Sequence, residues 1–455
     1  MVASNREITD LLSHVLGRSD APETEVLYVG QDSALTRFAN NQIHQNVREH
    51  DASLQVRVID DGRIGVASTN HLDESGISDV LARATAIAAR SAPNPNAAVL
   101  PEPDGREYDG ELGYVEATAE AGADLRGQGA RAVIAAGEAK GLDTSGSFST
   151  SVMTLAVANS KGVSSLHRST RSALLTVMMD GFASGAASGY ANAGSPDVRE
   201  IDAAALGAEA AEKGDRMRGA EVLEAGEYEV ILEEYAVAGL LEYLAYIGFS
   251  GLAVEEHRSF MELGSRVMGE NVSIWDDGHD ESGYPAPIDF EGVVRQRVDL
   301  IRDGMANAVV HDAATGARAG SGSTGHGLPA PNLIGPMPMN LFMAPGSAPR
   351  DELVRGVQRG IWVTRFHYIN PVHPKKAILT GMTKDGTFLI ENGTISRPLL
   401  NFRFTQSIPE AFSDVRAASD ATRLLPGEFF GSARVPALHL GSFNFTGTTA
   451  AEGGA

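Results

Sequence analysis

Residues 54–66 read LQVRVIDDGRIGV, and apolar residues largely alternate with polar ones on both sides of the dipeptide Asp61-Gly62. Alternation of this kind places the apolar side chains on one face of a strand. A two-residue type I′ turn needs positive φ at both central positions, which Gly adopts freely and Asp tolerates. The stretch therefore predicts a tight hairpin and, with it, an antiparallel sheet.

The rest of the first 220 residues predicts helices packed on this sheet. Apolar residues at helical spacing and stretches rich in Ala, Glu and Arg favour helices between the strands. The expected fold class is α+β, with an N-terminal layered domain of helices over an antiparallel sheet. The expected helices and strands, in that order, are Ile8–Leu16, Ser75–Arg90, Val115–Lys140 and Ile201–Arg218, then Glu25–Val29, Ala34–Phe38, Phe148–Ala158 and Ser172–Met179.

The second half of the chain is richer in short strands. Turn dipeptides occur at Asp303-Gly304, Asp385-Gly386 and Asn392-Gly393, and such dipeptides favour hairpins. We predict an N-terminal α+β domain over residues 1–220, a C-terminal domain with a curved antiparallel sheet over 221–446, and a flexible tail over 447–455.

Charge and composition exclude several kinds of partner. The chain has 455 residues, with 37 Lys and Arg against 59 Asp and Glu, which gives a formal net charge of −22. Clustered cations are needed to bind phosphate backbones and anionic bilayers, so we expect neither nucleic acid nor a membrane as partner. The longest apolar stretch, Ala238–Val254, contains Glu242 and is shorter than the ~20 residues that span a bilayer. Since the N-terminus lacks the pattern of a secretory signal, we expect a cytoplasmic protein.

Common catalytic motifs are absent or lack their context. The sequence has no cysteine, which excludes thiolate metal sites and Cys nucleophiles. Residues 320–325 match G-x-G-x-x-G but follow no apolar strand, so they predict a loop rather than a dinucleotide site. There is no G-x-S-x-G or Walker A sequence, which argues against serine hydrolases and P-loop enzymes. Single histidines more often have individual structural or surface roles than metal-binding ones.

The segment after the predicted strand at residues 228–232 carries the most information about function. Its apolar residues recur at helical spacing, with Glu242 on the flank of the apolar stripe and Tyr246 one turn beyond it. The residues of this stripe are Val237, Leu240, Leu241, Leu244 and Ile247.

At this helix the chain resembles the TldD/PmbA family, whose TldD-type members carry H-E-x-x-x-H there as part of a metallopeptidase site. The six matching positions here read LEYLAY, residues 241–246, so both histidines are missing. The resemblance is closer to the PmbA or TldE branch and extends over nearly the whole chain. Its motifs lie in five places: residues 35–45, 65–69, 290–304, 323–327 and 380–393.

The resemblance implies a subunit that has no catalytic residue and no metal ligand of its own. Leu241 and Tyr246 would fill the core where family ligands sit, and Glu242 would be a base without its metal. No thiol is present to replace the C-terminal cysteine ligand of the catalytic members. The expected role is that of a TldE-like partner in a heterodimer with a TldD-type subunit that carries zinc and cleaves an unfolded or modified peptide. His326 and Arg365 are the candidates for lining the substrate channel.

Two other interpretations remain open from the sequence. One is an active metal-dependent hydrolase with a relocated site built from His257, His326, His367 or His373 and nearby carboxylates. The other is a homodimeric scaffold protein without a peptidase partner.

Overall fold

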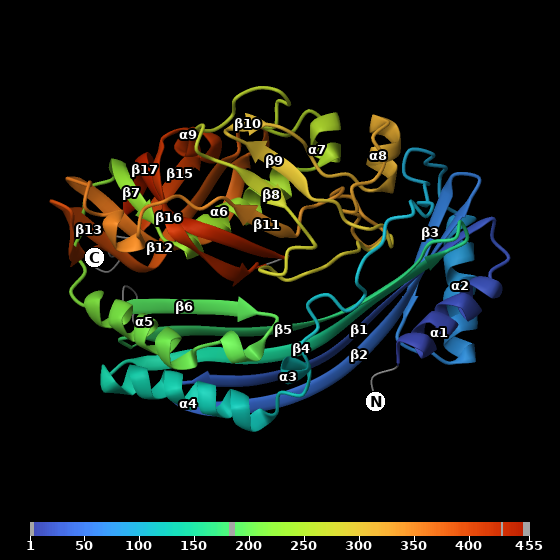
Figure 1. Cartoon of the computed structure of the whole chain (residues 1–455), viewed down its shortest axis with the longest axis horizontal. Helices are drawn as coiled ribbons and strands as arrows, with labels where there is room; N and C mark the ends of the chain where they lie inside the picture. Colours follow the sequence, from blue (N-terminus) through green and yellow to red (C-terminus); the bar gives the residue numbers. More distant parts are fainter. Residues whose placement is uncertain (1–3, 182–186, 429–430, 449–455) are drawn as a thin grey trace, which may run out of the picture.

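The computed structural model describes residues 4–181, 187–428 and 431–448, and these form two β-sheets with helices around them (Figure 1). The first sheet has six strands and the second has eleven. The α+β fold class is confirmed, with helices over an antiparallel sheet in the N-terminal half and a strand-rich C-terminal half. The last strand ends at Thr448, and residues 449–455 of the predicted tail lie outside the described residues.

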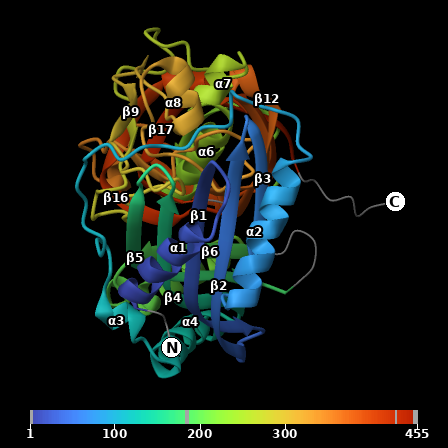
Figure 2. The same cartoon turned by 90° about the vertical axis from the view of Figure 1, so that its right-hand side faces the viewer.

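The N-terminal sheet is antiparallel throughout, in the order β3-β2-β1-β4-β5-β6. It is curved, with the C-terminal half against one face and the helices against the other (Figures 1 and 2). Helices α1 and α2 cover the β1–β3 end, and α4 and α5 cover the β4–β6 end. The elements are α1 (Asn5–Gly17), β1 (Glu23–Ala39), β2 (Gln42–Asp60), β3 (Arg63–Thr69), α2 (Glu74–Ala88), α3 (Glu116–Ala119), α4 (Ala123–Ala139), β4 (Asp143–Asn159), β5 (Ser164–Met179), β6 (Ser188–Ser195), η1 (Val198–Glu200) and α5 (Ala203–Arg216).

The two strands predicted at Glu25–Val29 and Ala34–Phe38 are parts of the single strand β1. Between the two predicted strands, Gly30 pairs with Ala52 of β2 and with Thr154 of β4. Backbone partners on both sides therefore keep this polar segment extended, because every buried backbone group needs a hydrogen bond.

The hairpin predicted at Asp61-Gly62 is confirmed, with φ of 47° and 72° at the two residues, between β2 and β3. We expect Gly62→Ala to lower the free energy of unfolding by about 1–2 kcal/mol, because a Cβ is strained in this left-handed conformation. Thermal unfolding measures the change. Gly17→Ala at the end of α1, where no neighbouring atom lies within 4 Å, is the control and should not destabilise. Equal losses in the two variants would contradict the assignment of the turn.

The predicted helix Val115–Lys140 is interrupted, since α3 ends at Ala119 and α4 begins at Ala123. The break has a tertiary cause. Thr118 donates a hydrogen bond of 2.7 Å to the carbonyl oxygen of Pro196 and accepts one of 2.7 Å from the backbone N–H of Val198. These bonds attach α3 to the segment before α5.

The C-terminal sheet is mostly antiparallel, but the pairs β11–β17 and β12–β7 are parallel, so the sheet is mixed. Helix α6 packs on this sheet, chiefly against β12 and β17. The elements are β7 (Gly226–Leu232), α6 (Glu234–Ile247), α7 (Gly251–Glu255), β8 (Ile274–Asp276), β9 (Val298–Arg302), β10 (Met305–Ala306), α8 (Ala313–Ala319), β11 (Asn340–Met343), η2 (Arg350–Glu352), β12 (Arg359–His373), η3 (Pro374–Lys376), β13 (Ile378–Glu391), β14 (Thr394–Pro398), β15 (Phe402–Ser407), α9 (Ile408–Ser413), β16 (Val415–Pro426) and β17 (Ser432–Thr448).

Two of the three predicted turn dipeptides in this half form turns. Asp303-Gly304 joins β9 to β10, and Asn392-Gly393 joins β13 to β14. The prediction for Asp385-Gly386 is wrong, because both residues lie within β13. Their φ angles of 58° and 137° instead accompany an irregularity in the pairing of β12 with β13, as in a β-bulge.

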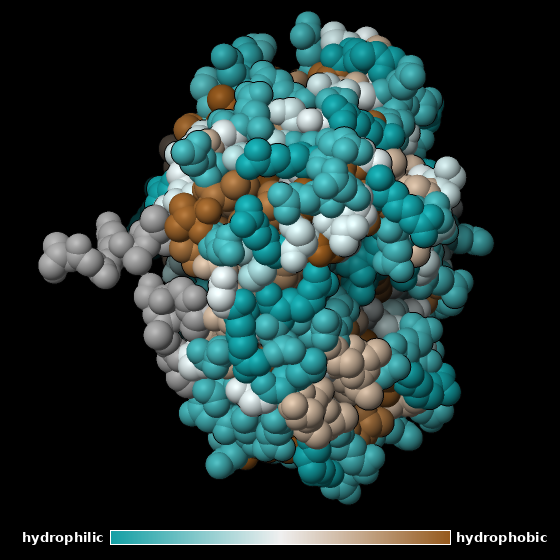
Figure 3. All heavy atoms as spheres, turned by 90° about the vertical axis from the view of Figure 1, so that its left-hand side faces the viewer, coloured by the Kyte–Doolittle hydropathy of each residue, from teal (hydrophilic) through white to brown (hydrophobic). Residues whose placement is uncertain are grey.

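The surface is largely hydrophilic on the face drawn in Figure 3. Over the described part of the chain, no helix combines the length and the apolar character needed to cross a bilayer.

Candidate functional site

Helix α6 separates the core from a pocket. The predicted apolar stripe is confirmed on the core side, where each of its residues is at most 3% exposed: Val237, Leu240, Leu241, Leu244 and Ile247. The helix begins directly after β7 and ends before Gly248. The opposite side of the helix presents Ala238, Gly239, Glu242, Tyr243 and Tyr246 to the pocket.

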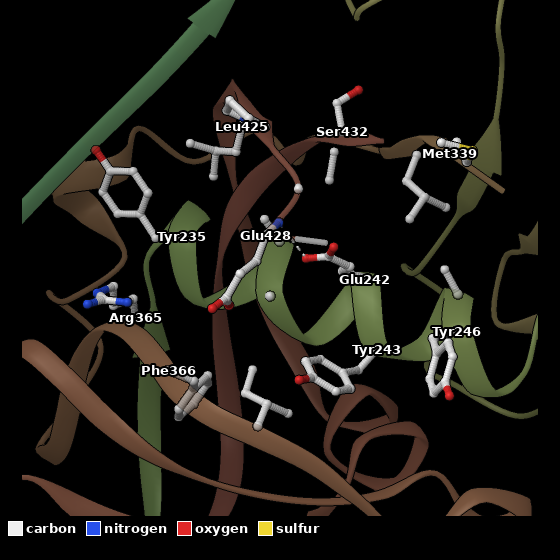
Figure 4. Close-up of a pocket in the computed structure, with 18 of the residues that line it drawn as sticks. Tyr235, Glu242, Tyr243, Tyr246, Met339, Arg365, Phe366, Leu425, Glu428 and Ser432 are labelled. Carbon is white, nitrogen blue, oxygen red and sulfur yellow. Dashed lines mark hydrogen bonds between the residues drawn. The ribbon is translucent and has the colours of Figure 1, made fainter. Parts of the chain in front are cut away.

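The pocket has a volume of about 500 Å³ and takes its walls from both halves of the chain. Tyr190 and Asn192 of β6 form one wall, and Arg365 and Phe366 of β12 another. Figure 4 shows α6 passing behind the cavity, with Glu428 reaching into it. The remaining lining comes from the ends of β12 and β16, the start of β17 and the segment before β11. A concave, mostly apolar cavity of this size is typical of a site for a small ligand or a piece of a larger one.

The side chains at the positions that match H-E-x-x-x-H do not all point towards the pocket. Leu241 is fully buried in the core, as expected, but Tyr246 is 43% exposed and lines the pocket, so the expectation that it fills the core is wrong. Residues five apart on a straight helix lie about 140° from each other, which accounts for the difference. Glu242 lies on the pocket side.

The residues present do not fit a zinc ion. Within residues 4–181, 187–428 and 431–448, no three His, Asp or Glu side chains come close enough to hold a metal. Leucine and tyrosine at positions 241 and 246 replace the imidazoles that zinc prefers.

The four histidines proposed for a relocated metal site lie in four different environments. The ring of His367 packs on Tyr368, with 4.2 Å between the ring centroids. His373 accepts a hydrogen bond of 3.3 Å from the backbone N–H of Lys376. His257 follows α7 with a φ of 57°, and His326 is buried elsewhere. The structure does not bring these side chains together.

His326 and Arg365, the two candidates for a substrate channel, lie in different environments. His326 is fully buried, with Nε2 2.9 Å from Oδ1 of Asp276 and Nδ1 2.9 Å from Oγ1 of Thr324. Burial lowers the pKa of His326, and the neighbouring Asp276 opposes this effect. His326 lies inside the fold, and it is not among the residues that line the pocket.

Arg365 lies on the pocket wall and is held in place by a buried acid. Its Nε is 2.6 Å from Oδ2 of Asp385, the residue at the irregularity in β13, and Oδ1 of Asp385 accepts a hydrogen bond of 2.6 Å from Ser188. The guanidinium lies 4.4 Å from the ring centre of Tyr190, a cation–π distance. Arg365 is thus a fixed part of the wall.

Glu233, at the start of α6, was not anticipated from the sequence. Its carboxylate is fully buried and accepts hydrogen bonds from Lys213 (2.7 Å), Arg350 (2.8 Å), Trp362 (2.6 Å) and Thr364 (2.7 Å). Burial alone would raise the pKa of Glu233, but the two cations and the hydrogen bonds outweigh it and lower the pKa to about 2. Because Lys213 belongs to α5, this cluster fixes α6 to the N-terminal half.

Two acidic residues meet at the centre of the pocket. The backbone N–H of Glu428 donates a hydrogen bond of 3.0 Å to Oε2 of Glu242 (Figure 4). Burial raises the pKa of Tyr243, and the charges of Glu428 and Glu242 raise it further. Burial is also the main cause of the raised pKa of Tyr190, which Arg365 opposes and Glu428 reinforces. The charge of Glu428 therefore acts on both sides of the pocket.

Comparisons with known proteins agree on one family. The PmbA/TldA metallopeptidase C-terminal domain matches residues 225–447, and PmbA/TldA metallopeptidase domain 1 matches residues 24–88. A metalloprotease PmbA homolog of Haemophilus influenzae is 24% identical over 406 residues, which cover 85% of each chain. An uncharacterized protein of Methanocaldococcus jannaschii is 27% identical over 315 residues, 68% of this chain and 72% of that protein.

Among solved structures, the fold is similar to that of TldE from Thermococcus kodakarensis. The TM-score is 0.86 at 19% identity, over 97% of this chain and 100% of the other. Together the two matched domains cover more than half of the sequence. The chain belongs to the PmbA/TldD family of metallopeptidase-like proteins.

Proposed function

We propose that this chain is the TldE-like subunit of a TldD/TldE-type metallopeptidase complex, in which it binds part of an unfolded or modified peptide and binds no catalytic metal. The observation that carries the proposal is the pocket side of α6. It has the concavity of a binding site, while the positions that match the family's metal ligands are Leu241 and Tyr246.

The names of relatives support a metallopeptidase context. Haemophilus influenzae has both a metalloprotease PmbA homolog and a metalloprotease TldD homolog that resemble this chain. In the proposed complex, the second kind of subunit provides the zinc and the water that zinc activates. The chain described here provides a surface that holds the peptide near that centre.

Exposed apolar residues near the pocket support docking of a partner there. Leu333 is 92% exposed, Tyr368 72% and Val372 57%. Each is next in sequence to a residue that lines the pocket. Large exposed apolar side chains close to a cavity are typical of interaction surfaces.

Metal analysis and co-purification test the proposal. We expect the isolated chain to contain far less than one zinc per molecule and to cleave no peptide. Co-expressed with a TldD-type protein from the same genome, it should co-purify with that protein, and the pair should cleave an unfolded peptide until a chelator is added.

Variants at the rim make the test specific. Leu333→Asp should weaken co-purification by about tenfold or more, because it places a charge in an apolar contact. Ile87→Asp on α2, also exposed in the free chain, should have no effect. About one zinc per isolated chain, lost when two of the four histidines above are replaced, would support the relocated metal site instead. Self-association without any TldD-type partner would support the scaffold interpretation.

A further inference from the structure

The charge balance of the pocket beside α6 is negative. Among the described residues that line it, Glu242, Glu428 and Arg365 carry charge. Arg365 is already paired with Asp385, which is 1% exposed, so that pair contributes no net charge. The two remaining carboxylates make the cavity attractive to a cation.

The two carboxylates are placed around the same space. The hydrogen bond from Glu428 N–H to Glu242 keeps the two residues adjacent. Figure 4 shows the Glu428 side chain extending between Arg365 and Tyr243, with the Glu242 carboxylate beside the Glu428 backbone. A cation in this space would meet both acids and the tyrosine ring.

Asn192 supplies an independent sign of a ligand. Asn192 is 8% exposed and lines the pocket, and its side-chain Oδ1 atom has no hydrogen-bond partner. The backbone N–H of Asn192 donates a hydrogen bond of 3.2 Å to the hydroxyl oxygen of Tyr235. A buried carbonyl oxygen without a donor is unfavourable, so a ligand that brings an N–H group to it gains affinity.

The walls suit an aliphatic chain with a polar end. Phe366, Ile369 and Leu425 give apolar surface, and the rings of Tyr243 and Tyr246 lie on the acidic side. Lysine and arginine combine an aliphatic stem with a cationic head that carries several N–H donors. Neither an acidic nor a purely apolar side chain would satisfy both the carboxylates and Asn192.

We infer that the pocket binds peptide segments through a basic side chain, whose stem packs on the apolar wall and whose cation lies beside Glu428 and Glu242. The inference rests on the proposed function, since the ligand is the peptide. It adds that the subunit prefers peptides with a basic side chain. A free peptide N-terminus is the other source of the same ammonium chemistry.

Calorimetric titration of the full chain with short peptides tests the inference. The probes are acetyl-Ala-Leu-Lys-Leu-Ala-amide and the same peptide with norleucine or with glutamate in place of lysine. Norleucine keeps the stem and removes the charge. We expect the lysine peptide to bind about tenfold more tightly than the norleucine peptide, and the glutamate peptide to bind most weakly. An unacetylated norleucine peptide that binds as tightly as the lysine peptide would assign the site to the N-terminus and overturn the choice of side chain.

Two matched variants separate the pocket from the overall charge of the chain. Glu428→Gln should reduce the preference for lysine over norleucine to about twofold or less, because it removes one charge and keeps the shape. Glu138→Gln, at an exposed position on α4, changes the net charge equally and should keep the tenfold preference. Unchanged melting temperatures would show that both variants fold.

The results also separate this inference from the proposed function. Equal binding of the lysine and norleucine peptides would overturn the preference and leave peptide binding by the subunit in place. A preference that survives in Glu428→Gln would overturn the assignment to this pocket. If none of the peptides binds, the inference fails, and co-purification with a TldD-type protein still decides the partner role.

Discussion

Glu233→Ala is expected to lower the free energy of unfolding by about 3 kcal/mol, because it leaves two cations and two neutral donors without their common acceptor. Lys213 and Arg350 keep Glu209 and Glu234 as partners, at 2.7 Å and 3.3 Å, which limits the loss. A pKa of about 2 against the ordinary 4.5 corresponds to a similar value, about 3 kcal/mol. Chemical denaturation at pH 7 measures the change.

The destabilisation by Glu233→Ala should become smaller as the pH falls. Because the pKa of Glu233 is lowered in the folded state, its contribution is fully present above about pH 4.5 and is lost as the pH falls towards 2. The gap between the wild type and Glu233→Ala should therefore close in that range. The control is Glu221→Ala, which removes an exposed ion pair with Arg397 and should cost less than about 1 kcal/mol. A gap that persists at pH 2 would contradict the role of the ion pairs.

Arg57→Met is expected to have a comparable or larger effect, about 3–5 kcal/mol at pH 8. Arg57 is 7% exposed, and its guanidinium lies 2.7 Å from Glu25 of β1 and 3.3 Å from Glu291 of the C-terminal half. Its removal leaves two buried carboxylates without a cation. Burial and the neighbouring acids Asp289 and Glu25 already raise the pKa of Glu291, and Arg57 is the group that opposes them.

The loss in Arg57→Met should also shrink as the pH falls, but over a higher pH range than that of Glu233→Ala. A carboxyl whose pKa is raised on folding destabilises the fold as the pH rises above its unfolded pKa of about 4.5. The defect should therefore be largest at pH 8 and smaller near pH 5, where the acids can take up protons. Arg48→Met, which breaks an exposed ion pair between the same two strands, should cost less than about 1 kcal/mol at both values. Equal losses for the two arginines would refute the buried cluster.

Sequence patterns predicted those parts of the fold whose signals are local. The Asp61-Gly62 turn and the stripe of α6 depend only on nearby residues, through turn geometry and helical periodicity. The continuity of β1 through Gly30 depends on partners in β2 and β4, which periodicity cannot reveal. The break between α3 and α4 likewise depends on Pro196 and Val198, about 80 residues away from Thr118.

The candidate site was predictable to a smaller extent. Arg365 lies on the pocket wall, whereas His326, taken from the same resemblance, is buried beside Asp276. Burial of a single polar residue cannot be read from its own neighbours in sequence. Glu233 has partners from three separate elements, α5, η2 and β12, and Asn192 reaches the pocket only because two sheets meet there.

The shared walls of the pocket have a consequence for how such proteins diverge. One side of the cavity comes from β6 in the first half of the chain, and the other comes from α6 and β12 in the second. Recombination that exchanged whole halves between two relatives would pair one parent's Asn192 with the other parent's Glu242. If the pocket binds a ligand, both halves would therefore have to change together to alter its preference.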